Sequence, residues 1–471
     1  MLSIGTGDVL SRAIGFAVFV YAARILAEGD FGAWNVAAAW TGLLVPIVDF
    51  GLGYTGTRSI ARDPSSLPDM LTHIVLLRLV LAGGSVVVIT LLAFLAGLDQ
   101  MTVGLVTVCG LSLVVQAFSL SWAYQGTGNA YWFLVEKLTQ SILYAGLVVL
   151  LFHPPMSVLW FPAFLFLSTS LSVLIVVVGF AVPRIVGDVK VSLRAFFLRH
   201  RGTIGPGVLT SLVSNTRLVI DILIVGSLLG TAAAAGFSAS FRFYVVLLLI
   251  PNLLWSSFYP MLSRAVSDSG PWQSSVRILF TFTWWFCGFL AGVGFQFGSE
   301  LFAMVYDERY AETAWLFPWM LTGAAIAIPS LVSTRILPAA GEERTMFWIS
   351  AAALGVHGGV SLILTMHFGV GGTIGGLLVS EILLASGGLL TLRRLSASGL
   401  LQSAVRPGLA AVLVFAGVGS AFRMLDISWW TTLGFCGGAY ILWFVRDAKE
   451  LVKELSRVDR VMIGTPDEGP P

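Results

Sequence analysis

The chain has 471 residues, of which 57% are hydrophobic and 11% are charged, with a formal net charge of +2 at pH 7. Soluble globular domains carry about 25% charged residues, so this composition indicates an integral membrane protein. A helix needs about 20 apolar residues to cross a bilayer, and spans of that length use up the chain. We therefore expect no separate catalytic domain, no enzyme activity, no cofactor or metal, and no nucleic-acid partner.

Apolar runs separated by polar breaks predict fourteen membrane helices. The first run lacks the basic segment that precedes the core of a cleaved signal peptide, so we expect it to remain as a helix. The predicted helices cover residues 4–27, 32–57, 74–97, 101–124, 130–152, 157–182, 204–229, 237–260, 276–298, 313–334, 345–366, 370–392, 407–422 and 427–445.

The Lys and Arg residues alternate along the chain in a way that fits fourteen spans. With the N-terminus inside the cell, nineteen of the 27 basic residues fall in breaks on the cytoplasmic side or in the tail, whereas Arg309 and Arg423 fall outside. Cytoplasmic loops of membrane proteins are enriched in Lys and Arg. We therefore predict a multi-pass protein of the inner (plasma) membrane, surrounded by membrane lipids, with both termini in the cytoplasm.

Residues of the first two predicted helices recur in the seventh and eighth at offsets of 204 or 205. The pairs are Arg12 and Arg217, Gly32 and Gly236, and Pro46 and Pro251. Transporters are often built from internal repeats that enclose the substrate site. These residue types are common, so a chance match is the alternative. The predicted fold is all-α, with two six-helix lobes as parallel repeats. Its parts are an N-lobe at 1–182, a cytoplasmic linker at 183–203, a C-lobe at 204–392, two further helices at 393–445, and a cytoplasmic tail at 446–471.

Charged side chains inside the predicted spans are the first candidates for function, because an ionisable group at the bilayer centre costs about 2.5–3.5 kcal/mol. Asp8 and Arg12 are four residues apart, as are Arg217 and Asp221, so each pair lies on one helix face. Self-neutralised structural bridges are the alternative interpretation. Guanidinium groups bind phosphate through two parallel hydrogen bonds. The candidate substrate-binding residues are Arg12, Arg58, Arg217 and Arg242.

Carboxylates and histidines inside the spans are candidates for coupling transport to H⁺ or Na⁺, because their charge changes on protonation. These residues are Asp49, Asp221, Glu381 and His357. A satisfied polar contact in the core is the alternative for His357. We interpret Arg78 as an arginine that extends toward the membrane surface. Glu136 and Lys137 are adjacent on one helix and point in different directions, so we expect no bridge between them.

Four segments resemble one family of transporters. They are VPIVDFGLGYTGTRSIAR at 45–62, AARILAEGDFGAWNVA at 22–37, DILIVGSLLG at 221–230 and IPNLLWSSFYPMLSR at 250–264. They resemble the polysaccharide transporter family of the multidrug/oligosaccharidyl-lipid/polysaccharide (MOP) superfamily, which includes the Wzx-type O-antigen flippases. Many Wzx-type members have twelve helices, whereas fourteen are predicted here, as in MurJ-type lipid II flippases.

The resemblance implies translocation of an undecaprenyl-diphosphate-linked oligosaccharide by alternating access, with polysaccharide assembly proteins as further partners. The basic residues Arg12, Arg58, Arg217 and Arg242 would then line a cavity between the lobes and meet the pyrophosphate or sugar acids. Two alternatives stay open: a MATE-like cation-coupled antiporter of drugs or metabolites, and a MurJ-like lipid II flippase. A membrane-embedded glycan polymerase or glycosyltransferase is disfavoured, because the acidic outer loop at 300–312 is too short to hold a catalytic site.

Overall fold

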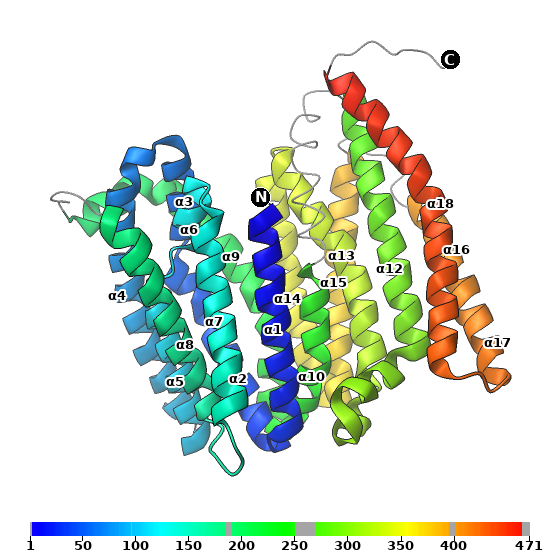
Figure 1. Cartoon of the computed structure of the whole chain (residues 1–471), viewed down its shortest axis with the longest axis horizontal. Coiled ribbons are helices and arrows are strands. Elements are labelled where there is room, and N and C mark those ends of the chain that lie inside the picture. The colour runs from blue at the N-terminus through cyan, green and yellow to red at the C-terminus, as the bar shows by residue number, and fades with distance from the viewer. Residues whose placement is uncertain (1, 96, 185–190, 250–268, 395–401, 464–471) are drawn as a thin grey trace. The chain divides into compact units, whose positions relative to one another are not determined.

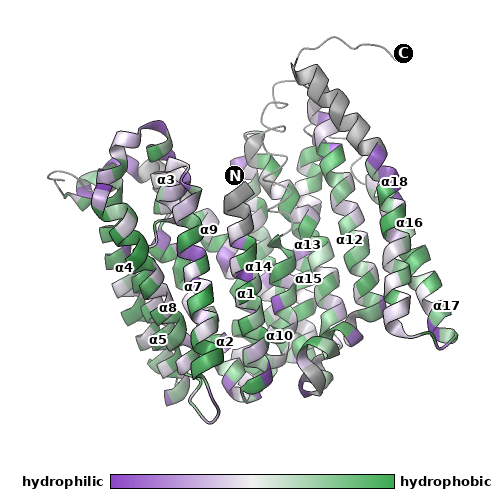
Figure 2. Cartoon of the chain, in the orientation of Figure 1, coloured by the Kyte–Doolittle hydropathy of each residue, from purple (hydrophilic) through white to green (hydrophobic). Residues whose placement is uncertain are grey.

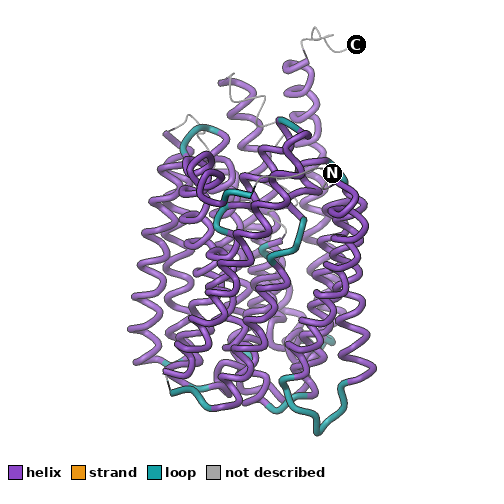
Figure 3. Tube along the Cα trace, turned by 90° about the vertical axis from the view of Figure 1, so that its left-hand side faces the viewer, coloured by secondary structure: helices purple, strands orange, loops and turns teal. Residues whose placement is uncertain are grey.

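The computed structural model describes residues 2–95, 97–184, 191–249, 269–394 and 402–463. Helices dominate these ranges, and no strand occurs within them (Figures 1 and 3). Eleven of the described helical segments are long and apolar enough to cross a membrane, and Thr231–Leu247 is a shorter apolar helix. The prediction of an all-α membrane protein is confirmed, whereas the count of fourteen spans stays a prediction.

The chain divides into two compact units, Met1–Ala239 and Ser240–Pro471. The helices that begin in the first unit are α1 (Leu2–Ile25), α2 (Glu28–Asp49), α3 (Leu52–Arg62), α4 (Leu67–Leu95), α5 (Gln100–Gln116), α6 (Ser121–Thr127), α7 (Ala130–Leu151), α8 (Trp160–Val176), α9 (Leu193–Leu229) and α10 (Thr231–Leu247). The helices of the second unit are α12 (Ser269–Tyr306), α13 (Leu316–Ala339), α14 (Glu343–Phe368), α15 (Val370–Arg394), α16 (Val405–Ala411), α17 (Gly419–Met424) and α18 (Trp429–Ile463). The predicted lobes and their boundaries stay a prediction.

Helix α4 shows how the helices distribute their apolar residues. Ile74, Ala82 and Ile89 are buried on one side of it, while Val87 and Phe94 on the other side are more than half exposed. Figure 2 shows hydrophobic residues along most of the length of α4, α5 and α8. Large exposed apolar surfaces of this kind are expected where a helix meets lipid.

The second predicted span, 32–57, is two helices. The chain turns between α2 and α3 because Phe50 and Gly51 both have left-handed backbones, with φ of 48° and 69°. The Phe50 N–H donates to Pro46 O at 2.9 Å, which closes the last turn of α2. The hydrophobic pattern runs straight through this turn, and the prediction of one continuous helix was therefore wrong.

The fourth predicted span, 101–124, is also interrupted, since α5 ends at Gln116 and α6 begins at Ser121. Helix α6 packs against α3: the Thr57 hydroxyl donates to Trp122 O at 3.0 Å. A Cβ on Gly126 would lie 3.1 Å from Thr57 O. The two interruptions therefore produce a pair of short helices, α3 and α6, at one end of the first unit (Figure 1).

Two polar residues fix the starts of helices in the first unit. The Asp99 carboxylate caps α5 by accepting from the Thr102 N–H at 3.0 Å and from its hydroxyl at 2.6 Å. The hydrogen bond from the Thr102 side chain lowers the pKa of Asp99. Ser192 precedes α9, and its N–H donates to Nε2 of the buried His73 at 3.1 Å. This bond ties the beginning of α9 to α4.

In the second unit, glycines allow neighbouring helices to approach closely. A Cβ on Gly376 of α15 would lie 2.1 Å from the Ser361 hydroxyl of α14, so α14 and α15 approach closely at this glycine. Helix α18 packs on α12, where the Tyr440 hydroxyl donates to Trp285 O at 2.9 Å. Helix α18 continues without a break to Ile463, so the fourteenth predicted span, 427–445, extends as one helix into the predicted tail.

Candidate functional site

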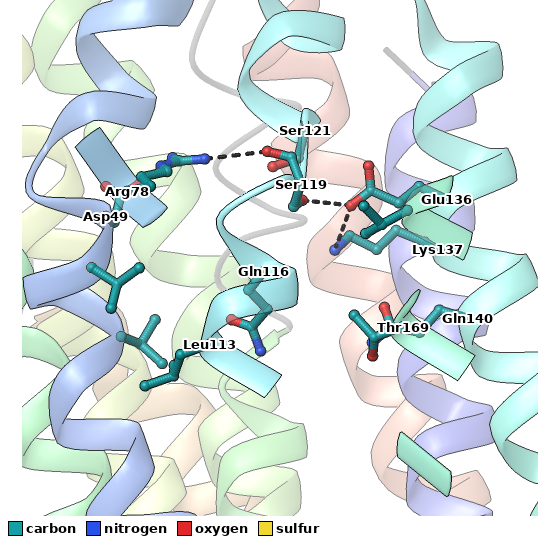
Figure 4. Close-up of a pocket in the computed structure, with 13 residues that line it drawn as sticks. Asp49, Arg78, Leu113, Gln116, Ser119, Ser121, Glu136, Lys137, Gln140 and Thr169 are labelled. Carbon is teal, nitrogen blue, oxygen red and sulfur yellow. Dashed lines mark hydrogen bonds and ion pairs between the residues drawn. The ribbon is translucent and has the colours of Figure 1, made fainter. Parts of the chain in front are cut away.

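A polar cavity of about 350 Å³ lies inside the first unit (Figure 4). It borders both helix interruptions, because Asp49 ends α2 while Ser119 and Ser121 lie at the junction between α5 and α6. Helices α4, α7 and α8 complete its walls. The lining residues are Val45, Val48, Asp49, Arg78, Leu113, Gln116, Ser119, Ser121, Glu136, Lys137, Gln140, Thr169 and Val173.

Arg78 of α4 connects the two interruptions. Arg78 is buried, with 7% of the residue exposed. Its Nη2 forms an ion pair with Asp49 Oδ1 at the end of α2. Its Nη1 donates to Ser119 O at 3.2 Å. Carbonyl groups just beyond a helix end lack the donors that a continuing helix would supply, and in a membrane they need a replacement. The guanidinium of Arg78 supplies that replacement while it neutralises Asp49.

The opposite wall carries the second pair of charges. Glu136 of α7 is 2% exposed, and its Oε1 accepts from the Ser119 hydroxyl at 2.5 Å. Lys137 Nζ lies 3.8 Å from the same carboxylate oxygen. Ser119 therefore contacts both walls, through its carbonyl oxygen on one side and its hydroxyl on the other.

Two amides and a threonine complete the polar lining. Gln140 of α7 donates from Nε2 to the Thr169 hydroxyl of α8 at 2.9 Å. Gln116 ends α5 and lies between the Arg78 side and the Glu136 side of the cavity (Figure 4). Two carboxylates and two cations balance one another across the lining, so the cavity is strongly polar without net charge. Among the described residues, no group of three or more His, Cys, Asp and Glu side chains could hold a metal ion.

The four arginines predicted to bind substrate do not line this cavity as the described residues define it. Arg12 forms the bridge expected from its spacing, with Nε 2.9 Å from Asp8 Oδ2, and both side chains are substantially exposed. This ion pair is the self-neutralised bridge that stood as the alternative interpretation of the spacing. Arg58 is exposed on α3. Their role in binding an anion stays a prediction.

Arg217 and Asp221 lie on α9, where Arg217 is partly buried and Asp221 is fully buried. This helix packs on α2, since a Cβ on Gly226 would lie 2.5 Å from the Val36 side chain. Arg242 is partly buried on α10. Arg217 and Arg242 therefore lie within helices and are only partly exposed.

The residues predicted to couple ions fall in different places. Asp49 lines the cavity of the first unit. Glu381 of α15, in the second unit, is 2% exposed and accepts from the Tyr244 hydroxyl at 2.8 Å and from the Ser330 hydroxyl at 3.1 Å. His357 of α14 is fully buried. Glu381 is thus a deeply buried carboxyl group held by two hydroxyl groups.

Three charged residues of the cavity were misjudged from the sequence. Arg78 does not extend to the surface, because it is buried and paired. Glu136 and Lys137 do approach one another, because the long lysine side chain curves back toward its neighbour. The signal that could have found Arg78 is Asp49, an opposite charge on the preceding span. Gln116 and Gln140 carry no charge, and the sequence offered no reason to single them out.

Residues 1–266 match the model of a family described as polysaccharide biosynthesis proteins. The chain belongs to this family. No curated protein matches it in sequence. The family agrees with the polysaccharide transporter family predicted from the sequence, and three of the segments behind that prediction, 22–37, 45–62 and 221–230, lie in described parts of the first unit. The segment at 250–264 lies outside the described residues.

Solved structures share the fold at low sequence identity. The lipid II flippase MurJ in an inward closed conformation is similar with a TM-score of 0.72 and 12% identity, over 96% of this chain and all of that one. An inward-facing multidrug resistance MATE family transporter of the MOP superfamily gives a TM-score of 0.65 and 14% identity, over 83% of this chain and 96% of that one. The MATE transporter VcmN of Vibrio cholerae, as a point mutant, gives a TM-score of 0.56 and 18% identity, over 85% of this chain and 96% of that one. The chain therefore has the fold of the MOP superfamily transporters.

Proposed function

We propose that this protein is a flippase that carries an undecaprenyl-diphosphate-linked oligosaccharide across the inner membrane. The glycan would serve the biosynthesis of O-antigen, capsule or exopolysaccharide, and transport would proceed by alternating access. The observation that carries this proposal is the match of residues 1–266 to a family of polysaccharide biosynthesis proteins. The MurJ-like fold supports it, because that fold already serves a lipid-linked substrate in MurJ.

The arginines Arg12, Arg58, Arg217 and Arg242 are the proposed contacts for the diphosphate or for acidic sugars. Arg58 is exposed at the end of the first unit where α3 lies, and can meet a head group at the membrane surface. Arg217 is partly buried within a span. Its guanidinium stays charged at any working pH and has the planar donor geometry that suits a phosphate group. Polysaccharide assembly proteins are the expected partners on the product side.

Transport is proposed to be coupled to H⁺ or Na⁺. Asp49, Asp221 and His357 remain candidates, but Glu381 is favoured by its geometry. Glu381 is 2% exposed and accepts one hydroxyl hydrogen bond on each carboxylate oxygen. A buried carboxyl group of this kind can bind a proton or a small cation during transport.

A cation-coupled antiporter of drugs or metabolites is the second candidate function, because MATE transporters share the fold. A MurJ-like lipid II flippase is the third, for the same reason. The fold alone does not separate these activities. The family match favours the polysaccharide flippase, since it concerns polysaccharide biosynthesis.

Charge reversal at Arg217 tests the proposed function. In cells that lack the chromosomal gene, a plasmid-borne Arg217→Glu variant should reach the membrane at the normal level yet fail to restore surface glycan, because the anionic head group loses its contact. Arg62→Glu, on the exposed face of α3 with no part in the proposed site, is the matched control and should restore display. Normal surface glycan with Arg217→Glu would sink the assignment of Arg217. Absence of any glycan defect in the gene deletion itself would sink the flippase proposal.

A further inference from the structure

We propose that the cavity of the first unit is a subsite for a single uncharged sugar unit of the transported glycan, bound through Arg78, Gln116 and Gln140. The proposal deepens the proposed function and rests on it for the source of the sugar. It is separate from the arginine contacts with the diphosphate, because none of those four arginines lines the cavity as described.

The charges of the lining favour a ligand without net charge. Asp49 is paired with Arg78, and Glu136 lies beside Lys137, so each half of the cavity is already neutralised. An anion entering this space meets two carboxylates, and a cation meets an arginine and a lysine. A neutral ligand enters without disturbing either pair.

The lining also has hydrogen-bonding capacity that its neighbours do not use. Arg78 is 7% exposed, and its Nε has no hydrogen-bond partner among the described residues. In the described structure, the only hydrogen bond from the Gln140 amide is the one to Thr169, which leaves its oxygen available, and the Gln116 amide has none. A ligand that both donates and accepts is needed to satisfy these groups.

A pyranose ring meets these requirements better than other neutral molecules. Its hydroxyl groups can donate to the Gln140 oxygen, and accept from Arg78 Nε and the Gln116 amide. Its C–H faces can rest on the apolar part of the lining, which consists of Val45, Val48, Leu113 and Val173. The volume of about 350 Å³ is at the small end of the range for ligand sites, roughly 300–1,000 Å³, and suits one ring rather than a chain of sugars.

Protection of an introduced thiol measures occupancy directly. Val45→Cys places a thiol on the apolar wall without removing a hydrogen-bonding group, and the three native cysteines are all buried. The full chain in inverted and right-side-out membrane vesicles is treated with a methanethiosulfonate reagent, with and without glucose, N-acetylglucosamine or glucuronate. Either neutral sugar should slow modification about tenfold once its concentration is ten times its Kd. Glucuronate should have a much weaker effect.

Two variants make the result specific. Adding Gln116→Leu to Val45→Cys should abolish protection, whereas Gln100→Leu, the same change at the exposed start of α5, should leave protection intact. Ala61→Cys on the exposed face of α3 should react at one rate with or without sugar. Three outcomes would each overturn the proposal: equal protection in the Gln116→Leu variant, protection by glucuronate alone, or no protection by either neutral sugar. The last would show that the cavity holds water alone.

The outcome is distinguishable from failure of the proposed function. Loss of sugar protection in a protein that still restores surface glycan would remove the subsite and leave the flippase standing. Sugar protection in a protein whose gene deletion causes no glycan defect would keep the subsite and remove the flippase.

Discussion

Arg78 shows what a single side chain can do inside a membrane domain. Its guanidinium neutralises Asp49 and, at the same time, binds the carbonyl oxygen of Ser119, which the break between α5 and α6 leaves without a helical donor. A Cβ on Gly53 would lie 3.1 Å from both the guanidinium and the Asp49 carboxylate, so the glycine makes room for this contact. One residue thus meets an electrostatic need and a backbone need together.

Arg78→Lys should therefore destabilise the protein although it preserves the charge. An ammonium group cannot reach both acceptors with the planar fork of a guanidinium, so one buried acceptor loses its donor. We expect the free energy of unfolding to fall by about 1–3 kcal/mol, measured by thermal unfolding in detergent. Arg62→Lys at an exposed position should change it by less than about 0.5 kcal/mol. Equal stability of the two variants would contradict the double role of Arg78.

Glu381→Gln tests ion coupling at residue scale. The amide keeps the shape and can still accept from the Tyr244 and Ser330 hydroxyls, but it cannot exchange a proton or balance Na⁺. In proteoliposomes, an imposed H⁺ or Na⁺ gradient should no longer stimulate translocation by the variant, while gradient-independent exchange persists. Glu343→Gln, at the exposed start of α14, should behave like the parent protein. A gradient response that survives in Glu381→Gln would exclude this residue from coupling.

Sequence reasoning at this scale succeeded where two opposite charges lie four residues apart on one helix. The bridge between Asp8 and Arg12 follows from their spacing alone and is present. The environment of Arg78 does not follow from spacing, because its partners come from α2 and from the junction after α5, 29 and 41 residues away. Uncharged residues such as Gln116 are harder still to identify as part of a site from the sequence. A polar amide within a span does not require an oppositely charged partner.

At the scale of elements, the interruption between α2 and α3 has the largest consequences. The sequence DFGLG at 49–53 lies within an apolar stretch that continues on both sides, so hydrophobicity predicts one helix. The turn depends on backbone conformation instead, with φ of 69° at Gly51 and 48° at Phe50. Hydrophobic patterning locates spans well and is insensitive to a break of this kind, because an interrupted helix and a continuous one bury the same residues.

Gly51→Ala should strain this turn. A residue with a Cβ pays about 1–2 kcal/mol in the left-handed region, and Gly51 is buried, so the strain cannot be relieved by moving outward. We expect lower thermal stability and faster amide hydrogen exchange in α3 and α6. Gly15→Ala is the matched control, because Gly15 is helical and a Cβ there meets nothing within 4 Å. That variant should be as stable as the parent protein or more stable by up to ~1 kcal/mol. A Gly51→Ala protein as stable as the control would show that the turn is not held in the left-handed conformation.

At the scale of the whole molecule, the sequence predicted the class and the family of the protein. Apolar composition identified a membrane protein, the described helices confirmed it, and the family match confirmed the resemblance seen in a few segments. The position of the cavity was beyond sequence reasoning, because five helices and a junction contribute to it and their packing is a tertiary property. The internal repeat predicted a site at the arginines between the predicted lobes. It gave no indication of a cavity inside the first unit.

The distribution of basic residues makes a testable statement about topology. Alkaline phosphatase is active outside the cytoplasm, so a fusion within the predicted outer loop, after Glu312, should be active. A fusion after Gly341, between α13 and α14, should be inactive because that connection is predicted to be cytoplasmic. Green fluorescent protein at either terminus should fluoresce. The reverse pattern would place the arginines of α3 on the outer face and overturn the predicted topology.

The contact between α3 and α6 has a mechanical consequence. The Thr57 hydroxyl holds Trp122 O, and Gly56 lies directly beneath the Trp122 ring, so the two short helices are fastened to one another. Each is joined to its long helix through a non-helical junction, at residues 50–51 and 117–120. Any displacement of α3 and α6 as one unit would therefore require both junctions to change together. Arg78 contacts Asp49 just before the first junction and Ser119 within the second, so it holds the two junctions in a fixed relation to one another.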